Sequence, residues 1–587
     1  MTNVYVLLDS RDIALLEHDI CPNDFVISDL ACNGLPGTKV SLSINKEDEL
    51  VDYVHEIYSS KLICDDKDNG YVNNFYECTI RPLIKYIDSI DNLLTSKANL
   101  SFRFGIKPKY MIKTSTYFLA EYESMGVKLY DRHSTFLPYI IEYLDTRDAK
   151  YSFESISLKS QALVLNPIRK VSVFIYRYYH SLYASMNKKK VNKVDSVVYS
   201  NCIVLRTIGQ ARTILGLLEH TKTKTLVILP KSSLGEDTFS FMKSMIGNHY
   251  VDIVNCGYPT ALFASKIYLS PVFRKPVSKT ISLRGIKLNL SNALSEIRLM
   301  KKELSIYQYQ IESEIRKYTF SSSPTLFSLE FTSPHSYIDS LIARNYGFNS
   351  VQVQPCDRAI RPLPKPISSN FFLAKNRAAE KSFKQCWPEY AKTIMYLGSL
   401  GFNNSDAGNR HVKSNNKCKK KVCLFSSANS KLNAEIMDFI QTSNLNNRIE
   451  FYVKSHPRDT TNYDSYSIIT DCLSNNIALY NMISELDLAI TFPSAVITEI
   501  IQCRVPICIY IPQHSDYIAA NEQLEKALIK FRRCYSLKEL QELILDIDEF
   551  RTEAINVIDS YIESSSLSFD IPRFERKLKN ILEEQLS

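Results

Sequence analysis

The sequence predicts an α/β protein in which the last third forms a doubly wound, Rossmann-like parallel sheet. Short apolar runs of strand character alternate along the chain with segments of helical periodicity, and this alternation produces parallel sheets joined by right-handed crossovers. At 587 residues the chain is too long for one hydrophobic core, so we expect two to four domains. The alternation is clearest in four predicted strands, at 422–425, 449–454, 488–491 and 507–511.

Three regions follow from this pattern. Residues 1–165 are predicted to be an additional amino-terminal α/β region of unknown role, 190–400 a first Rossmann-like lobe, and 415–587 a second one. The polar stretch between the two lobes, around 401–421, has the composition of a linker. Within the first lobe, residues 283–318 carry a long helical pattern with charges distributed along it.

Composition excludes several classes of protein. Hydrophobic residues make up 45% and charged residues 23%, which is typical of a globular chain. The net charge of +8 is spread diffusely, and no nucleic-acid motif occurs, so we expect anionic partners but no nucleic acid. The 14 cysteines form no CxxC pair and no disulfide rhythm. We therefore expect free thiols, a cytoplasmic location, and no metal and no cofactor.

Residues 168–193 combine aromatic and basic side chains, a mixture that suits an anionic bilayer surface. A peripheral contact with the inner face of the cytoplasmic membrane is one interpretation. A buried helix followed by a charged linker explains the same residues equally well. No stretch of 18 apolar residues occurs, so the sequence predicts no membrane span.

The first candidate site follows the predicted strand at 449–454. Alternation along that strand directs Lys454 and Tyr452 to the same face, and His456 emerges at the carboxyl end. In doubly wound sheets ligands bind beyond the carboxyl ends of the strands. Pro457 fixes the backbone there, and Lys454, His456 and Arg458 can all donate to phosphate oxygens. A purely structural histidine is the alternative.

A second candidate edge follows the predicted strand at 488–491. Pro493 and Ser494 open a predicted helix at 495–502, whose amino end offers backbone N–H groups to an anion. The hydroxyls of Thr491 and Ser494 can bind a ligand or simply cap the helix. Glu499, one turn along, can accept hydrogen bonds from ribose hydroxyls or stay solvated.

These motifs resemble a known family. The order strand, Lys-x-His-Pro-Arg, strand, Thr-Phe-Pro-Ser, then Glu, Pro and a strand is similar to the carboxyl-terminal lobe of GT-B glycosyltransferases, especially bacterial sialyltransferases, polysialyltransferases and capsule ulosonic-acid (Kdo-type) transferases. The stretch from Ser328 to Ser399 resembles the end of the amino-terminal lobe in these enzymes and in the polymerases of teichoic acid synthesis. The resemblance covers about residues 190–587 and implies two Rossmann-like lobes with a cleft between them.

The resemblance also implies roles for the candidate residues. His456 would contact the phosphate of a CMP-linked donor with Pro457 shaping the turn, Thr491 and Ser494 would hold that phosphate, and Glu499 would approach the ribose. The general base would be a carboxylate, for which the nearest matches are Asp357 and Glu330.

The implied reaction moves sialic acid or a related ulosonic acid onto a glycan or glycolipid acceptor of the bacterial surface, such as capsule, lipopolysaccharide or O-antigen, without a metal. Two rivals stay open at this point. One is a polyol-phosphate transferase that uses a CDP-glycerol type donor, and the other is a non-catalytic scaffold of a polysaccharide-synthesis complex.

Overall fold

The computed structural model describes most of the chain in separate stretches. Those stretches are residues 2–8, 10–28, 35–40, 42–62, 80–108, 136–157, 197–230, 246–256, 280–289, 304–330, 333–354, 366–375, 377–398, 419–427, 430–443, 445–456, 461–473, 483–492, 496–511 and 531–565, with short pieces or single residues at 73, 76, 239–240, 242–243, 362–363, 459 and 576.

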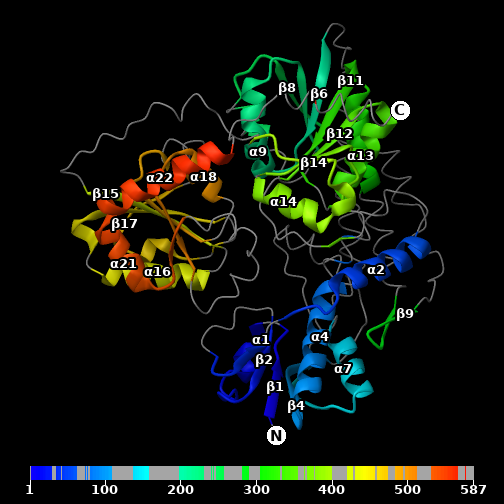
Figure 1. Cartoon of the computed structure of the whole chain (residues 1–587), viewed down its shortest axis with the longest axis vertical. Helices are drawn as coiled ribbons and strands as arrows, with labels where there is room; N and C mark the ends of the chain where they lie inside the picture. Colours follow the sequence, from blue (N-terminus) through cyan, green and yellow to red (C-terminus); the bar gives the residue numbers. More distant parts are fainter. Residues whose placement is uncertain are drawn as a thin grey trace. The chain divides into compact units, whose positions relative to one another are not determined.

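Within these residues the chain forms three sheets of five, seven and six strands and one separate two-stranded hairpin (Figure 1). The first sheet has the order β3-β2-β1-β4-β5, and all its neighbouring strands are parallel. Its strands are β1 (Thr2–Val6), β2 (Phe25–Ile27), β3 (Thr38–Val40), β4 (Leu100–Pro108) and β5 (Lys150–Ser157).

The second sheet has the order β14-β13-β12-β11-β6-β7-β8, and the third has the order β17-β16-β15-β18-β19-β20. The strands of the second are β6 (Val198–Val204), β7 (Thr225–Leu229), β8 (Val251–Asn255), β11 (Thr319–Ser328), β12 (Asn349–Val353), β13 (Phe371–Leu373) and β14 (Ile394–Met395). Those of the third are β15 (Lys420–Phe425), β16 (Ile449–Lys454), β17 (Ile469–Leu473), β18 (Leu488–Thr491), β19 (Ile507–Tyr510) and β20 (Arg532–Cys534).

All three sheets share one topology. Counted along the chain, the first strand of each sheet lies inside it, the next two strands extend to one side, and the later strands extend to the other. This is the order of the Rossmann fold, in which the strand order reverses at a single switch point. The predicted class, α/β with two Rossmann-like lobes and an additional amino-terminal α/β region, is therefore confirmed.

Helices connect these strands and cover the sheets. They are α1 (Ser10–Leu16), α2 (Glu47–Leu62), α4 (Arg81–Ser96), α7 (Leu137–Thr146), α9 (Ile208–His220), a helix at 304–315, α13 (Pro334–Tyr346), α14 (Arg377–Cys386), α16 (Ser430–Thr442), α18 (Val496–Gln502), α21 (Leu537–Leu545) and α22 (Ile547–Ser565).

The third sheet is buried on both faces, as a doubly wound sheet requires. Phe451 and Val453 of β16 pack in one apolar cluster with residues of α16 and α21. Tyr452 packs against a second cluster, which contains residues of α18 and Ile558 of α22. The alternation predicted for β16 is thereby confirmed, and Lys454, two residues after Tyr452, belongs to the α18 face by the same period.

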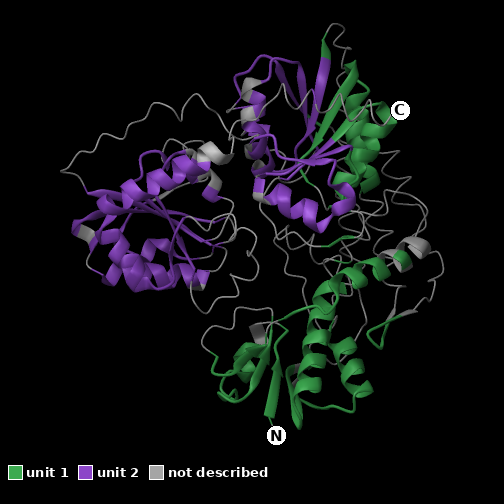
Figure 2. Cartoon of the chain, in the orientation of Figure 1, with its two compact units in different colours: residues 1–198, 255–350, 362–369 green, residues 199–254, 351–361, 370–587 purple. Residues whose placement is uncertain are grey.

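The chain divides into two compact units (Figure 2). Residues 1–198, 255–350 and 362–369 form the first, and residues 199–254, 351–361 and 370–587 form the second. The whole third sheet lies in the second unit, so the candidate donor residues at 454–499 can be described within one unit.

The sequence pattern suggested one long helix over residues 283–318, but these residues do not form one helix. Strands β9 (Thr280–Leu283) and β10 (Ile286–Asn289) form an antiparallel hairpin, and β11 begins at Thr319. Leu283 pairs with Ile286, so Arg284 and Gly285 make a two-residue turn, with φ of 53° and 81°. Two successive left-handed residues match the twist of a hairpin, and this local geometry overrides the helical pattern.

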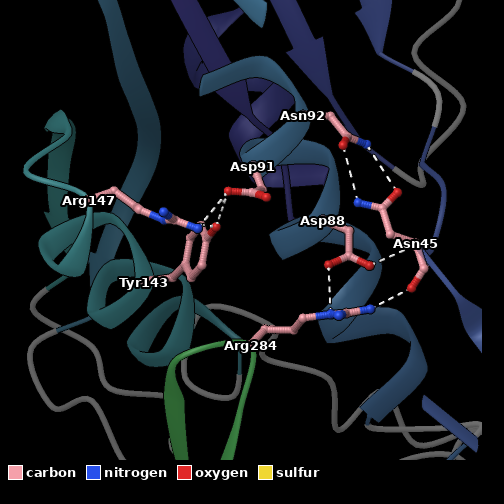
Figure 3. A network of polar contacts seen from close by, with 7 residues as sticks. All are labelled: Asn45, Asp88, Asp91, Asn92, Tyr143, Arg147 and Arg284. Atoms are coloured by element: carbon pink, nitrogen blue, oxygen red, sulfur yellow. Dashed lines mark hydrogen bonds and ion pairs between the residues drawn. The ribbon is translucent and has the colours of Figure 1, made fainter. Parts of the chain in front are cut away.

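The hairpin packs against the amino-terminal helices through Arg284 (Figure 3). The Arg284 guanidinium lies 3.2 Å from a carboxylate oxygen of Asp88 in α4 and donates to the Asn45 carbonyl at 2.5 Å. Asp88 is buried, and burial raises the pKa of its carboxyl, opposed by the Asn45 N–H and the Arg284 charge. The ion pair thus compensates a carboxylate that would otherwise be costly inside the protein.

Arg284→Ala should destabilise α4 locally by about 2 kcal/mol, because it leaves a buried carboxylate unpaired. Amide exchange in α4 should then become roughly 30-fold faster, measured by hydrogen–deuterium exchange. Asp88→Asn in the same background should recover part of the loss by removing the charge.

Arg147→Ala is the matched control for this prediction. Arg147 also donates to an α4 carboxylate, that of Asp91, at 3.0 Å, but both side chains of that pair are partly exposed. Its removal should cost less than about 1 kcal/mol. Equal effects of the two arginine variants would contradict the importance of the buried pair.

Candidate functional site

The carboxyl ends of three neighbouring strands in the third sheet lie level with one another. Phe425 of β15 pairs with Lys454 of β16 on one side and with Thr491 of β18 on the other. With strands about 4.8 Å apart, the Lys454 and Thr491 backbones are about 10 Å apart across one strand. The switch point of this sheet lies between β15 and β18, where ligands bind in such folds.

Lys454 is a buried cation at this edge, only 7% exposed. Its ammonium group lies 3.5 Å from the Ser455 carbonyl. Burial raises the pKa of the neighbouring Cys423 thiol, and the backbone and positive charge of Lys454 oppose that rise. Because Cys423 belongs to the apolar cluster that contains α18 residues, the Lys454 charge lies on the α18 face of the sheet. An ammonium group at the carboxyl end of a strand can donate charge-assisted hydrogen bonds to a ligand phosphate.

His456 stands two residues beyond β16, and its backbone is held at both ends. Its N–H donates to the Ser426 hydroxyl at 2.8 Å, and its carbonyl accepts from the Asp459 N–H at 2.9 Å. Ser426 follows β15, and its own N–H donates to the Lys454 carbonyl at 3.0 Å. His456 itself is partly exposed and is not buried in the apolar core.

The Asp459 carboxylate is the polar centre of this turn. One oxygen accepts from the Thr461 hydroxyl at 2.6 Å and the Thr461 N–H at 3.0 Å, and the other accepts from the Tyr463 hydroxyl at 2.6 Å. Burial opposes ionisation, but hydrogen bonds from Ser426, Thr461 and Tyr463 outweigh it and lower the pKa of Asp459 to about 2. Thr461 also donates to the Ser430 carbonyl at the start of α16.

The second predicted edge is described only in part. Thr491 is buried, and its hydroxyl donates to the Phe492 carbonyl at 3.0 Å. Helix α18 (Val496–Gln502) lies within the predicted helix at 495–502 and contains Glu499. Several predicted site positions lie outside the described residues, namely Asp357, Pro457, Arg458, Pro493 and Ser494, as does the side chain of Glu499.

Glu330, one of two predicted bases, follows β11 by two residues at the carboxyl edge of the second sheet. Strand β11 borders the switch point of that sheet, because its neighbours are β12 and β6. The Ser333 hydroxyl donates to the Glu330 carboxylate instead of capping α13, which Ser333 precedes. Glu330 therefore stands at the end of a strand in a defined orientation.

Sequence reasoning missed Ser426 and Asp459. The turn of small polar residues after the first strand of the lobe, 426–430, was visible in the sequence, but nothing local linked it to His456. That link arises only when β15 and β16 pair in parallel register. Asp459 was visible as the residue that follows Arg458, but its partners Thr461 and Tyr463 have no spacing that signals a binding role.

No protein-family model matches the chain, and no curated protein matches it. Among solved structures, a putative UDP-N-acetylglucosamine 2-epimerase from Listeria monocytogenes matches with 11% identity and a TM-score of 0.40, over 62% of this chain and 92% of its own. The structure of LpCGTa in complex with UDP matches with 9% identity and a TM-score of 0.43, over 66% of this chain and 99% of its own. The wall teichoic acid polymerase TagF, soaked with CDPG, matches with 11% identity and a TM-score of 0.39, over 73% and 100%.

Among the described residues, no helix is both long and apolar enough to cross a bilayer. The segment at 168–193, predicted either to contact a membrane surface or to form a buried helix and linker, lies outside the described residues.

Asp459 should make the lobe that contains the third sheet sensitive to acid. Its folded pKa of about 2 lies below the ordinary 3.8, so its contribution to stability is present above about pH 4 and is lost as the pH falls toward 2. Asp459→Asn should therefore destabilise β16 by about 1 kcal/mol at pH 7, a value discounted for partial exposure.

This difference should shrink as the pH approaches 3. The ratio of β16 amide exchange rates in variant and wild type, measured at each pH, removes the intrinsic pH dependence of exchange. A ratio that stays constant from pH 7 to pH 3 would show that the carboxylate is not preferentially ionised in the folded state.

Proposed function

We propose that the chain is a glycosyltransferase that uses a nucleotide-activated sugar, whose donor phosphate binds at the carboxyl edge of the third sheet. The donor class proposed is a CMP-linked sialic acid or related ulosonic acid, and the acceptor is a glycan or glycolipid of the bacterial surface. The supporting residues are Lys454 and His456, with Thr491 on the next strand but one.

One observation carries this proposal. A buried lysine ends strand β16, and a histidine with a fixed backbone follows it by two residues, on the strand next to the switch-point strand β15 of a Rossmann-ordered sheet. A lysine this well buried is uncommon at a merely structural strand end, because its charge is expensive to remove from water. A phosphate bound at this edge could accept charge-assisted hydrogen bonds from Lys454 and from the His456 imidazole.

The proposed chemistry uses these groups to stabilise the leaving group. A carboxylate, Glu330 or Asp357, takes the proton of an acceptor hydroxyl, and the resulting oxygen attacks the anomeric carbon of the donor. The bond from that carbon to the phosphate oxygen breaks, and the electron pair leaves with the phosphate. Lys454 and His456 then face the negative charge that develops on the departing nucleotide.

His456→Ala tests the donor site. Among CMP, CDP, UDP and GDP, we expect CMP to raise the melting temperature of the wild type most, because a ligand that binds only the native state stabilises it by mass action. The variant should lose most of that shift, and transfer from a CMP-linked donor should fall about 10²–10³-fold.

His18→Ala is the matched control, because the His18 side chain is 89% exposed in the amino-terminal region. It should bind CMP like the wild type. A shift with CDP and turnover of CDP-glycerol, with none for CMP donors, would replace the proposed donor with a polyol phosphate. If no nucleotide shifts the wild type, the donor-site proposal fails.

Glu330→Gln and Asp357→Asn separate the two candidate bases. The true base should lose about 10²–10⁴-fold in kcat with its nucleotide affinity unchanged, because proton removal from the acceptor occurs only during reaction. The other variant should retain near-normal kcat. If both variants keep full activity, neither carboxylate is the base.

A further inference from the structure

Ser426 and Asp459 hold the backbone of His456 from its two sides, and we call these three residues the His456 ring. The His456 N–H donates to the Ser426 hydroxyl, and the Asp459 N–H donates to the His456 carbonyl. The Ser426 hydroxyl in turn helps to lower the pKa of the Asp459 carboxyl. These contacts join the end of β15 to the turn that follows β16. The backbone on both sides of the imidazole is thereby fixed relative to the sheet.

The ring is itself anchored to the rest of the lobe. Thr461 bonds both to Asp459 and to the first residue of α16, Ser430, and Tyr463 is a buried residue of the apolar cluster on the α16 face. Asp459 therefore carries an ionised carboxylate with donors on both oxygens. A carboxylate held in this way is a rigid acceptor, which suits a role in orienting other groups.

We propose that Ser426 and Asp459 are positioning residues that act through His456, setting the direction of its imidazole and hence the affinity for the donor phosphate. This inference rests on the proposed function, because it assigns the ring to the same nucleotide site. Neither residue is required to touch the ligand. A site held by such a second set of contacts loses affinity when those contacts are removed, even though the ligand-binding groups remain.

The test compares four variants in binding of CMP, the nucleotide expected from the proposed donor. Ser426→Ala removes the acceptor of the His456 N–H and should raise the Kd about tenfold, whereas Ser426→Thr keeps the hydroxyl and should stay within about twofold of wild type. Asp459→Asn should raise the Kd by a similar factor of about ten. Ser443→Ala is the control, because that hydroxyl bonds to the Phe439 carbonyl at the far end of α16.

A double-mutant cycle separates positioning from direct contact. If Ser426 acts through His456, then Ser426→Ala should change the Kd little in a His456→Ala background. If Ser426→Ala instead raises the Kd by the same factor in the wild-type and His456→Ala backgrounds, Ser426 contacts the ligand itself. That result would overturn the positioning role. A tenfold loss for Ser443→Ala would also overturn it, because the effect would then not be specific to the ring.

Exchange of the His456 amide keeps the inference testable without any ligand. We expect Ser426→Ala and Asp459→Asn to accelerate it at least about fivefold in the unliganded full-length protein, while Ser426→Thr leaves it slow. If the wild type binds none of the nucleotides but exchange responds in this way, the donor site fails and the ring stands. If CMP binds but exchange and Kd are the same in every variant, the proposed function stands and the positioning role is wrong.

Discussion

Parallel register in the third sheet is the constraint on which the candidate site depends. Because Phe425 pairs with both Lys454 and Thr491, the three strands end at the same level, and whatever follows each of them emerges at one edge. A shift of one residue in the β15–β16 pairing would turn the Lys454 side chain to the opposite face. The apolar clusters on the two faces resist such a shift, since it would exchange Phe451 and Val453 with Tyr452.

The electrostatics of the edge follow from burial. Lys454 and Asp459 carry opposite charges in one turn region, and they are stabilised differently. Asp459 is surrounded by hydroxyl and amide donors, which favour its ionised form and lower its pKa. Lys454 lies at the strand end near the Cys423 thiol, and its backbone and positive charge oppose the rise in the pKa of that thiol that burial causes. An anion is therefore better accommodated beside Lys454 than beside Asp459, so the electrostatic potential differs between the two ends of this turn region.

The sequence was sufficient to predict an element where its hydrophobic periodicity and its flanking turn residues indicate the same boundaries. Strands β16 and β18 were predicted to the residue, because each is a short run of strand character bounded in the sequence by turn residues.

It was insufficient where long-range pairing decides. The β9–β10 hairpin was hidden inside a helical pattern. The left-handed turn at Arg284 and Gly285 and the tertiary contact between Arg284 and Asp88 together favour the strand form. Ser426 became part of the site only through its contact with a residue 30 positions away. Lys454 and His456 were predictable as candidates because they follow a strand, but the ring that fixes His456 was not.

Repetition of a topology does not repeat a site. The first sheet follows the same strand order as the third. Among its described residues, however, groups of the protein itself hydrogen-bond and pack at the carboxyl ends of the strands. Asp12 accepts from the Leu8 N–H at 2.7 Å, and Gly105 lies so close that an added Cβ would be 2.4 Å from the Asp12 carboxylate. The Leu7 carbonyl accepts from both Ser28 and Tyr86. At the third sheet the equivalent edge instead carries a buried lysine and a histidine fixed by its backbone. Function on this fold is therefore argued from the groups at the edge and not from the strand order.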